Sequence, residues 1–217
     1  MTDPIETNRR NWDERVAIHA RDTTGDYMLD RFRAGEDALH SIEAAELGDI
    51  SGKRVLHLQC HIGRDTLCLA RRGATVTGLD FSSPALDVAR RLSEETGLKA
   101  DFVEGTVDQA PDLTPGPFDL VFTTWGTICW LPDVKKWANI ISSVLAPGGE
   151  LYFADAHPGS WCWKKSMESS CRPTIFKRLR TGRCRSPTRP RTPATRRSCQ
   201  IKQHGSGYTP SRPCSAG

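Results

Sequence analysis

Residues 54–80 constrain the fold more than any other part of the chain. An apolar run at 54–59 enters a turn at 59–63, a helix-forming segment begins at Thr66, and a second apolar run at 74–80 ends on Asp80. In α/β folds, such a unit holds an adenosine group. The turn amides and the helix N-terminus face the polar part of the ligand, and the acid accepts hydrogen bonds from the ribose hydroxyls.

Further strands and helices are predicted on both sides of this unit. Helical spacing predicts helices at 6–22, 37–47, 84–95 and 134–145, with Ser83 as the N-cap before Pro84 and a loop or turn at 26–29. Apolar runs after turn residues predict strands at 100–104, 118–123 and 150–154. Alternating strands and helices predict an α/β fold with a doubly wound, mostly parallel Rossmann-like sheet and helices on both faces.

Four motifs in this order resemble those of the class I S-adenosylmethionine-dependent methyltransferases. They are the turn at 57–63, Gly-Leu-Asp-Phe-Ser at 78–82, Phe-Asp-Leu-Val at 118–121, and Leu-Ala-Pro-Gly-Gly-Glu-Leu at 145–151. The first motif departs from the usual acid followed by Gly-x-Gly-x-Gly, because His57 replaces the acid and Gln59 and His61 replace two glycines. The string His-Leu-Gln-Cys-His-Ile-Gly resembles a variant within the same family. The resemblance covers about residues 10–158.

The resemblance implies S-adenosyl-L-methionine as the cofactor and indicates which residues bind it. Asp80 would accept hydrogen bonds from the ribose, the segment after the third strand would hold the adenine, and side chains in the first turn would border the methionine part. The expected cofactor-binding residues are Gln59, Cys60, His61, Gly63, Asp80, Phe81, Thr106, Val107, Thr124 and Trp125. Members of the family commonly carry an acid at the Thr106 position. Trp125 could equally be a buried aromatic residue that packs in the core.

Substrate contacts are predicted from position alone. The expected residues are Trp12, His19 and Tyr27, as part of a lid, and His157 after the fifth strand. A polar loop residue is the simpler interpretation of His157. No catalytic residue is assigned, because methyl transfer by in-line displacement chiefly needs proximity and orientation. His57, Cys60 and His61 lie close together in the sequence, but no second ligand cluster lies at a zinc-like spacing, so no metal is expected.

The charge distribution divides the chain. Residues 1–158 carry a net charge of −9, whereas 159–217 carry 14 Lys and Arg, one acid and five of the eight Cys, for a net charge of +13. Three regions are expected: an N-terminal helical lid at 1–50, an S-adenosylmethionine-binding Rossmann-like domain at 51–158, and a basic, disordered tail at 159–217. No apolar run approaches the ~20 residues of a membrane span, so a cytoplasmic location and no membrane partner are expected.

The tail allows two interpretations. It is basic enough for a nucleic-acid-binding arm, but its Arg, Pro, Ser, Thr and Cys lack periodicity, as in an out-of-frame translation product. Codons permitted for 159–185 and 205–217, read one frame away, can encode segments that resemble the part of these methyltransferases after the fifth strand. We therefore predict a frameshift near Gly159 and an impaired chain that lacks the C-terminal strand 6/7 hairpin, with strand 150–154 as an exposed edge.

The function predicted from the sequence is methyl transfer from S-adenosylmethionine to a small-molecule oxygen, nitrogen or carbon. An RNA-directed methyltransferase or nucleic-acid-binding protein that uses the basic tail is the alternative, but no nucleic-acid partner is assigned. A nicotinamide dehydrogenase is disfavoured because Gly-x-Gly-x-x-Gly is absent. The methyl acceptor and the oligomeric state are not predicted.

Overall fold

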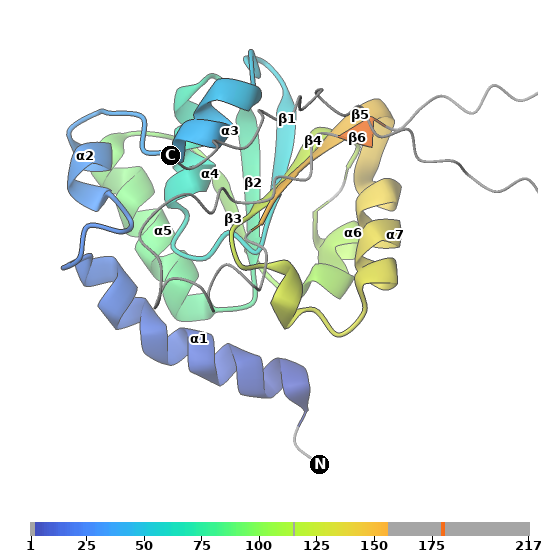
Figure 1. The fold of residues 1–217 in the computed structure, drawn as a ribbon, viewed down its shortest axis with the longest axis horizontal. Helices are drawn as coiled ribbons and strands as arrows, with labels where there is room; N and C mark the ends of the chain where they lie inside the picture. Colours follow the sequence, from blue (N-terminus) through green and yellow to red (C-terminus); the bar gives the residue numbers. More distant parts are fainter. Residues whose placement is uncertain (1–2, 115, 156–178, 181–217) are drawn as a thin grey trace, which may run out of the picture. The chain divides into compact units, whose positions relative to one another are not determined.

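The computed structural model describes residues 3–114 and 116–155 and the backbone of 179–180. Six strands form one sheet in the order β3-β2-β1-β4-β5-β6. The five parallel strands are β1 (Arg54–Leu58), β2 (Thr75–Asp80), β3 (Asp101–Glu104), β4 (Phe118–Thr124) and β5 (Leu145–Ala154). The doubly wound, mostly parallel sheet predicted from the sequence is confirmed (Figure 1).

Helices cover both faces of the sheet and bury two apolar clusters (Figure 1). One cluster joins the sheet to helices α1 (Pro4–Arg21), α2 (Leu29–Arg33), α3 (Ser41–Glu46), α4 (Arg64–Arg71) and α5 (Ser83–Thr96). The other cluster joins it to α6 (Ala110–Leu113) and α7 (Val134–Val144). Two short 3-10 helices, η1 (Val107–Gln109) and η2 (Ile128–Trp130), follow β3 and β4. This layering leaves the carboxyl ends of the strands as one edge, along which α1 lies.

Several predicted boundaries were wrong for local reasons. The helix expected from residue 37 begins at Ser41, because the side chains of His40 and Glu43 form a capping box. The N-cap of α5 is Ser82, not Ser83, since the Ser82 hydroxyl accepts the Ala85 N–H at 3.3 Å. Helix α2 was missed, and β5 begins five residues before the predicted strand.

The C-terminal predictions lie mostly outside the described residues. The two-residue strand β6 (Leu179–Arg180) pairs antiparallel with β5 at Leu151 and Glu150. At Leu179 and Arg180 this pairing differs from the disorder predicted for the tail. His157, the frameshift at Gly159 and the predicted disorder of the rest of the tail fall on undescribed residues and stay predictions. Among the described residues, no helix has the length and apolar character to cross a membrane.

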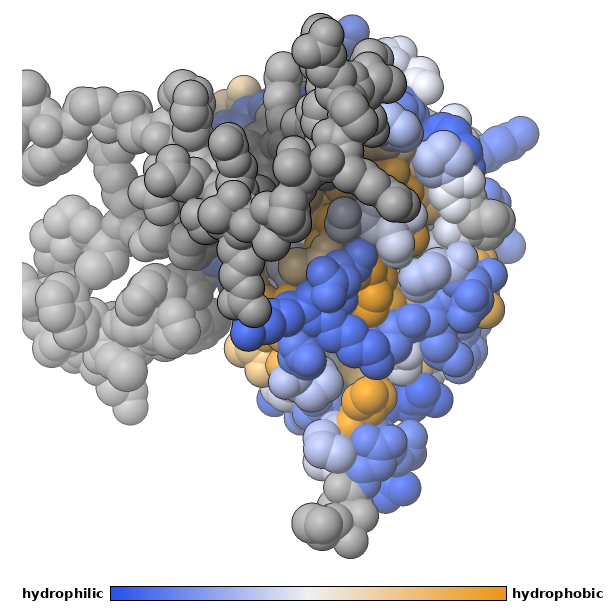
Figure 2. Space-filling model, turned by 90° about the vertical axis from the view of Figure 1, so that its right-hand side faces the viewer, coloured by the Kyte–Doolittle hydropathy of each residue, from blue (hydrophilic) through white to orange (hydrophobic). Residues whose placement is uncertain are grey.

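Among the described residues visible in Figure 2, hydrophilic ones predominate, with apolar areas between them. The large exposed hydrophobic side chains, on α1, α6 and α7, are Ile18, Leu113 and Val134. Isolated apolar residues of this kind are normal on a protein surface.

Candidate functional site

The turn after β1 alternates between left-handed and ordinary backbone. Gln59, His61 and Gly63 have φ values of 58°, 49° and 73°. A left-handed conformation costs a residue with a Cβ roughly 1–2 kcal/mol. The two positions at which the family motif would have glycine therefore keep the glycine-like conformation, although they carry side chains.

Gly63 is required for packing as well as for its φ value. A Cβ at this position would lie 2.5 Å from Ala89 Cβ on α5 and 2.8 Å from Phe102 Cε1 on β3. The same residue is the N-cap of α4. Its role in the described structure is thus to let α4 start close to α5 and β3.

Asp80 closes the turn from the neighbouring strand. Its carboxylate accepts the His61 N–H at 2.8 Å through Oδ2 and the Ser82 N–H at 2.9 Å through Oδ1. Burial raises the pKa of Asp80 to about 6, against the lowering effect of these N–H donors. An acid that is 6% exposed, at the carboxyl end of β2, is placed to accept hydrogen bonds from a polar ligand at this edge.

A cavity of about 70 Å³ adjoins Asp80 at the same edge. Its walls come from the first turn, the end of β2, the segment after β3, η2 and α1; the lining residues are Ile5, Asn8, Gln59, Leu79, Asp80, Phe81, Gly105, Thr106, Val107, Asp108, Trp130, Leu131 and Pro132. The predicted cofactor residues Gln59, Asp80, Phe81, Thr106 and Val107 therefore line one cavity. A larger hollow of about 540 Å³, near Lys53 and Asp119, contains none of them.

Polar groups in the cavity fit an adenosine-containing ligand. Gln59 donates from Nε2 to the Thr127 carbonyl at 3.2 Å, while its Oε1 is buried without a hydrogen-bond partner in the described residues. Such an orphaned acceptor suits an ammonium or hydroxyl donor of a ligand. The cavity itself is smaller than the ~300–1,000 Å³ of most ligand pockets, and Ile5 and Asn8 of α1 form part of its wall.

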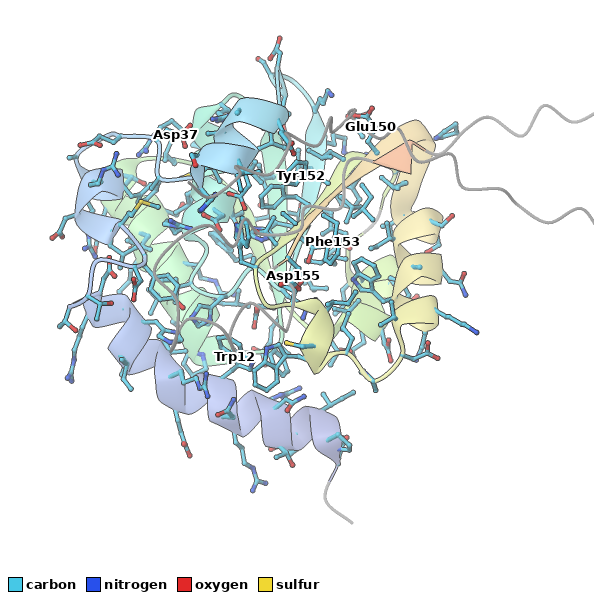
Figure 3. All side chains as sticks on the ribbon, viewed as in Figure 1. Trp12, Asp37, Glu150, Tyr152, Phe153 and Asp155 are labelled. Carbon is cyan, nitrogen blue, oxygen red and sulfur yellow. The ribbon has the colours of Figure 1, made fainter. Side chains whose placement is uncertain are left out.

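Three of the four predicted substrate residues, those on the N-terminal side, gather around His61. His61 Nε2 lies 2.8 Å from His19 Nδ1, and the ring centroids of Trp12 and Tyr27 lie 5.1 Å and 5.9 Å from that of His61. Trp12 projects from α1 toward the carboxyl ends of the strands (Figure 3) and packs edge-on against Trp130 of the cavity wall. This group of side chains, here called the histidine cluster (Trp12, His19, Tyr27, His61), joins α1 to the turn.

Trp125 follows β4 but does not line the cavity. Its indole N–H donates to Glu43 Oε1 on α3, a carboxyl group that is fully buried. Burial raises the pKa of Glu43 to about 8, with a further rise from nearby Asp65. The backbone after Trp125 is fixed by Asp155 at the end of β5, which accepts the Gly126 N–H at 2.7 Å.

The remaining predicted residues are buried near the turn. Cys60 is 4% exposed, and Thr124 is buried at the end of β4. Sequence reasoning missed Ile5, Asn8, Glu43 and Asp155. The first two share a helical face with Trp12, a spacing that was readable, whereas the contacts of Glu43 and Asp155 join distant segments and have no local sequence signal.

Residues 55–149 match the family model of a methyltransferase domain. This stretch is a methyltransferase domain, and its relatives support assignment to the class I S-adenosylmethionine-dependent methyltransferases. Two relatives, both ubiquinone biosynthesis O-methyltransferases, are similar to this methyltransferase. The protein of Erwinia tasmaniensis is 33% identical over 120 residues, which cover 55% of this chain and 49% of the relative. That of Escherichia coli O6:H1 is 31% identical over 157 residues, covering 69% of this chain and 61% of the relative.

A solved structure supports the same fold for the methyltransferase. The DhpI-SAH complex aligns with a TM-score of 0.54 at 24% identity, over 82% of this chain and 80% of that one. The chain spans only 49% and 61% of the length of the two curated relatives above. The likeness to the DhpI-SAH complex shows the fold, and the methyltransferase assignment rests on the family model and the curated relatives.

Proposed function

We propose that this chain transfers the methyl group of S-adenosylmethionine to a hydroxyl oxygen of a small molecule. The observation that carries the proposal is the placement of Asp80 and Gln59 in one cavity at the carboxyl ends of β1 and β2. Oxygen is favoured over nitrogen and carbon because the similar curated proteins are named O-methyltransferases.

Specific residues are suited to hold each part of the cofactor. Asp80 would accept hydrogen bonds from the ribose hydroxyls, and Thr106 and Val107 would flank the adenine. The buried Oε1 of Gln59 would accept a hydrogen bond from the methionine ammonium. Phe81 supplies an apolar wall next to Asp80. The other predicted cofactor residues would act at greater distance, by shaping the turn and the segment after β4. They are Cys60, His61, Gly63, Thr124 and Trp125.

S-adenosylmethionine, when bound, supplies a methyl group on a positively charged sulfur. Transfer of that methyl group to the acceptor hydroxyl would give the methylated oxygen, neutral S-adenosylhomocysteine and one released proton. The chain's own contribution is to hold the two reactants in line and to exclude water, which together can supply several kcal/mol of the rate enhancement. Trp12, His19 and Tyr27 are proposed to border the acceptor from α1, with residues 1–50 as a lid.

Calorimetric titration with S-adenosylhomocysteine tests the cofactor half of the proposal. The wild-type chain should bind, and Asp80→Ala should weaken binding by roughly 10-fold or more, since two charge-assisted hydrogen bonds are lost. Asp87→Ala is the matched control, because Asp87 is an acid on α5 that pairs with Arg90 away from the cavity. A folded wild-type sample that releases no heat would refute the assignment.

A second experiment tests the acceptor half. The chain is incubated with S-adenosylmethionine and a panel of hydroxylated and amino compounds of matched shape, and S-adenosylhomocysteine release is measured. We expect turnover with hydroxyl compounds. Turnover confined to the amino compounds would overturn the choice of oxygen and leave the cofactor site intact.

A further inference from the structure

One face of α1 lies along the cofactor cavity and the turn. Ile5, Asn8, Trp12, Val16 and His19 recur at helical spacing on this face. Ile5 and Asn8 line the cavity, and the Asn8 side-chain amide donates to the Trp130 carbonyl at 3.4 Å. Farther along the helix, Asp13 accepts a hydrogen bond from the Ser82 hydroxyl at 2.5 Å. In this arrangement α1 forms part of the wall of the cavity, which is smaller than most ligand pockets.

At the far end of this face, His19 contacts His61, a residue of the turn whose backbone conformation is unfavourable. His61 has a φ of 49°, in a turn where its neighbour Gly63 shows that glycine is accepted. Backbone strain of this kind persists where the surrounding structure and the function over-determine it. The contacts of the His61 side chain offer a reason why histidine stands here in place of glycine.

What that side chain contributes is a bond to α1. The His61 and His19 rings meet at 2.8 Å through Nε2 and Nδ1, with a ring-centroid distance of 5.0 Å. Burial lowers the pKa of both histidines, and Arg15 lowers that of His19 further. Both rings are therefore neutral near pH 7, so one ring donates an N–H and the other accepts it without charge repulsion.

The backbone of His61 also bonds to the proposed cofactor site. The His61 N–H donates to Asp80, the residue proposed to bind the ribose, at 2.8 Å. Gln59, the other strained residue of the turn, points elsewhere and bonds the Thr127 carbonyl. Only one of the two left-handed side chains thus reaches α1 in the described residues.

We infer that His61 is a latch that holds α1 closed over the cofactor cavity through its bond to His19, and that its strained backbone is retained for this contact. The inference rests on the proposed function in one respect, namely that the cavity is the cofactor site. Because Ile5 and Asn8 form part of its wall, movement of α1 away from the sheet widens the cavity for the cofactor, and that movement breaks the bond between His61 and His19.

Hydrogen exchange of α1 amides in the ligand-free chain tests the latch. His61→Gly should raise exchange along α1 by about 2- to 10-fold, the range for loss of one hydrogen bond. Gln59→Gly is the matched control, because it relieves similar strain in the same turn and the hydrogen bond of Gln59 goes to Thr127 and not to α1. It should leave α1 exchange unchanged. Equal exchange in wild type and His61→Gly, or equal increases in both glycine variants, would overturn the latch.

A variant of His19 tests whether the change in α1 exchange comes from the contact between His19 and His61 and not from the altered turn. His19→Phe keeps a ring on α1 but removes the hydrogen bond, and should raise α1 exchange in the same direction. Stopped-flow binding of S-adenosylhomocysteine should then show faster association and faster dissociation in both His variants. If the wild type fails to bind, the proposed function fails, but the exchange experiment still decides whether the latch exists. If binding occurs with unchanged rates and unchanged exchange, the latch alone is wrong.

Discussion

Replacing Gly63 by Ala should destabilise the whole domain. The left-handed φ of 73° costs a residue with a Cβ roughly 1–2 kcal/mol. The added Cβ would lie 2.5 Å from Ala89 Cβ and 2.8 Å from Phe102 Cε1, and overpacking of this kind costs ~1–3 kcal/mol. The expected loss is ~2–5 kcal/mol, a large fraction of the ~5–15 kcal/mol by which most domains are stable.

Urea denaturation followed by circular dichroism measures this loss. Gly97→Ala is the matched control: its φ of 67° is nearly the same, but a Cβ there would meet nothing within 4 Å. The control should therefore lose only the conformational part, ~1–2 kcal/mol. Equal losses at the two positions would refute the packing argument.

A double variant separates the two contacts. Adding Ala89→Gly to Gly63→Ala removes the nearer clash and leaves Phe102 in place. We expect a favourable coupling of ~0.5–3 kcal/mol between the two substitutions, the range seen for residues in contact. Strictly additive losses would show that Ala89 does not crowd Gly63.

Three further predictions concern titration and capping. Because the pKa of Asp80 is raised to about 6, affinity for S-adenosylhomocysteine in calorimetry should be constant above pH 6 and fall below it, and Asp80→Asn should abolish this dependence. The pKa of Glu43, raised to about 8 from 4.5, means that the native state favours its protonated form. The contribution of protonated Glu43 to the free energy of unfolding is full below pH 4.5 and is lost as the pH rises through 8. Glu43→Gln should therefore raise Tm at pH 8 but not at pH 4.5. Ser82→Ala should cost ~1 kcal/mol in urea denaturation through loss of the α5 N-cap, whereas Ser83→Ala should cost little.

The sequence was sufficient for the parts of the fold that are set locally. Each parallel strand was located because an apolar run lies between turn residues, and Asp80 was placed at the cavity because it ends such a run. The N-cap of α5 was misplaced by one residue, since adjacent serines offer the same hydroxyl and only the backbone conformation of Ser82 decides between them.

Contacts between distant segments were beyond sequence reasoning. Trp125 was expected at the cofactor, but its indole N–H bonds Glu43, which precedes it by 82 residues. Similarly, Trp12, His19 and Tyr27 were named from position alone, and no sequence pattern indicated that they meet at His61. Such pairings depend on the packing of α1 and α3 against the sheet edge, which is a tertiary property.

The alternation of left-handed residues at 59, 61 and 63 has a consequence for how such proteins are recognised. A search pattern written in amino-acid letters asks for three glycines and finds one. A pattern written in backbone dihedral angles finds all three positions, because Gln59 and His61 adopt the conformation that glycine would. In this turn, the shape of the main chain is the more faithful signature, and the side chains at the first two positions are free to take on other tasks.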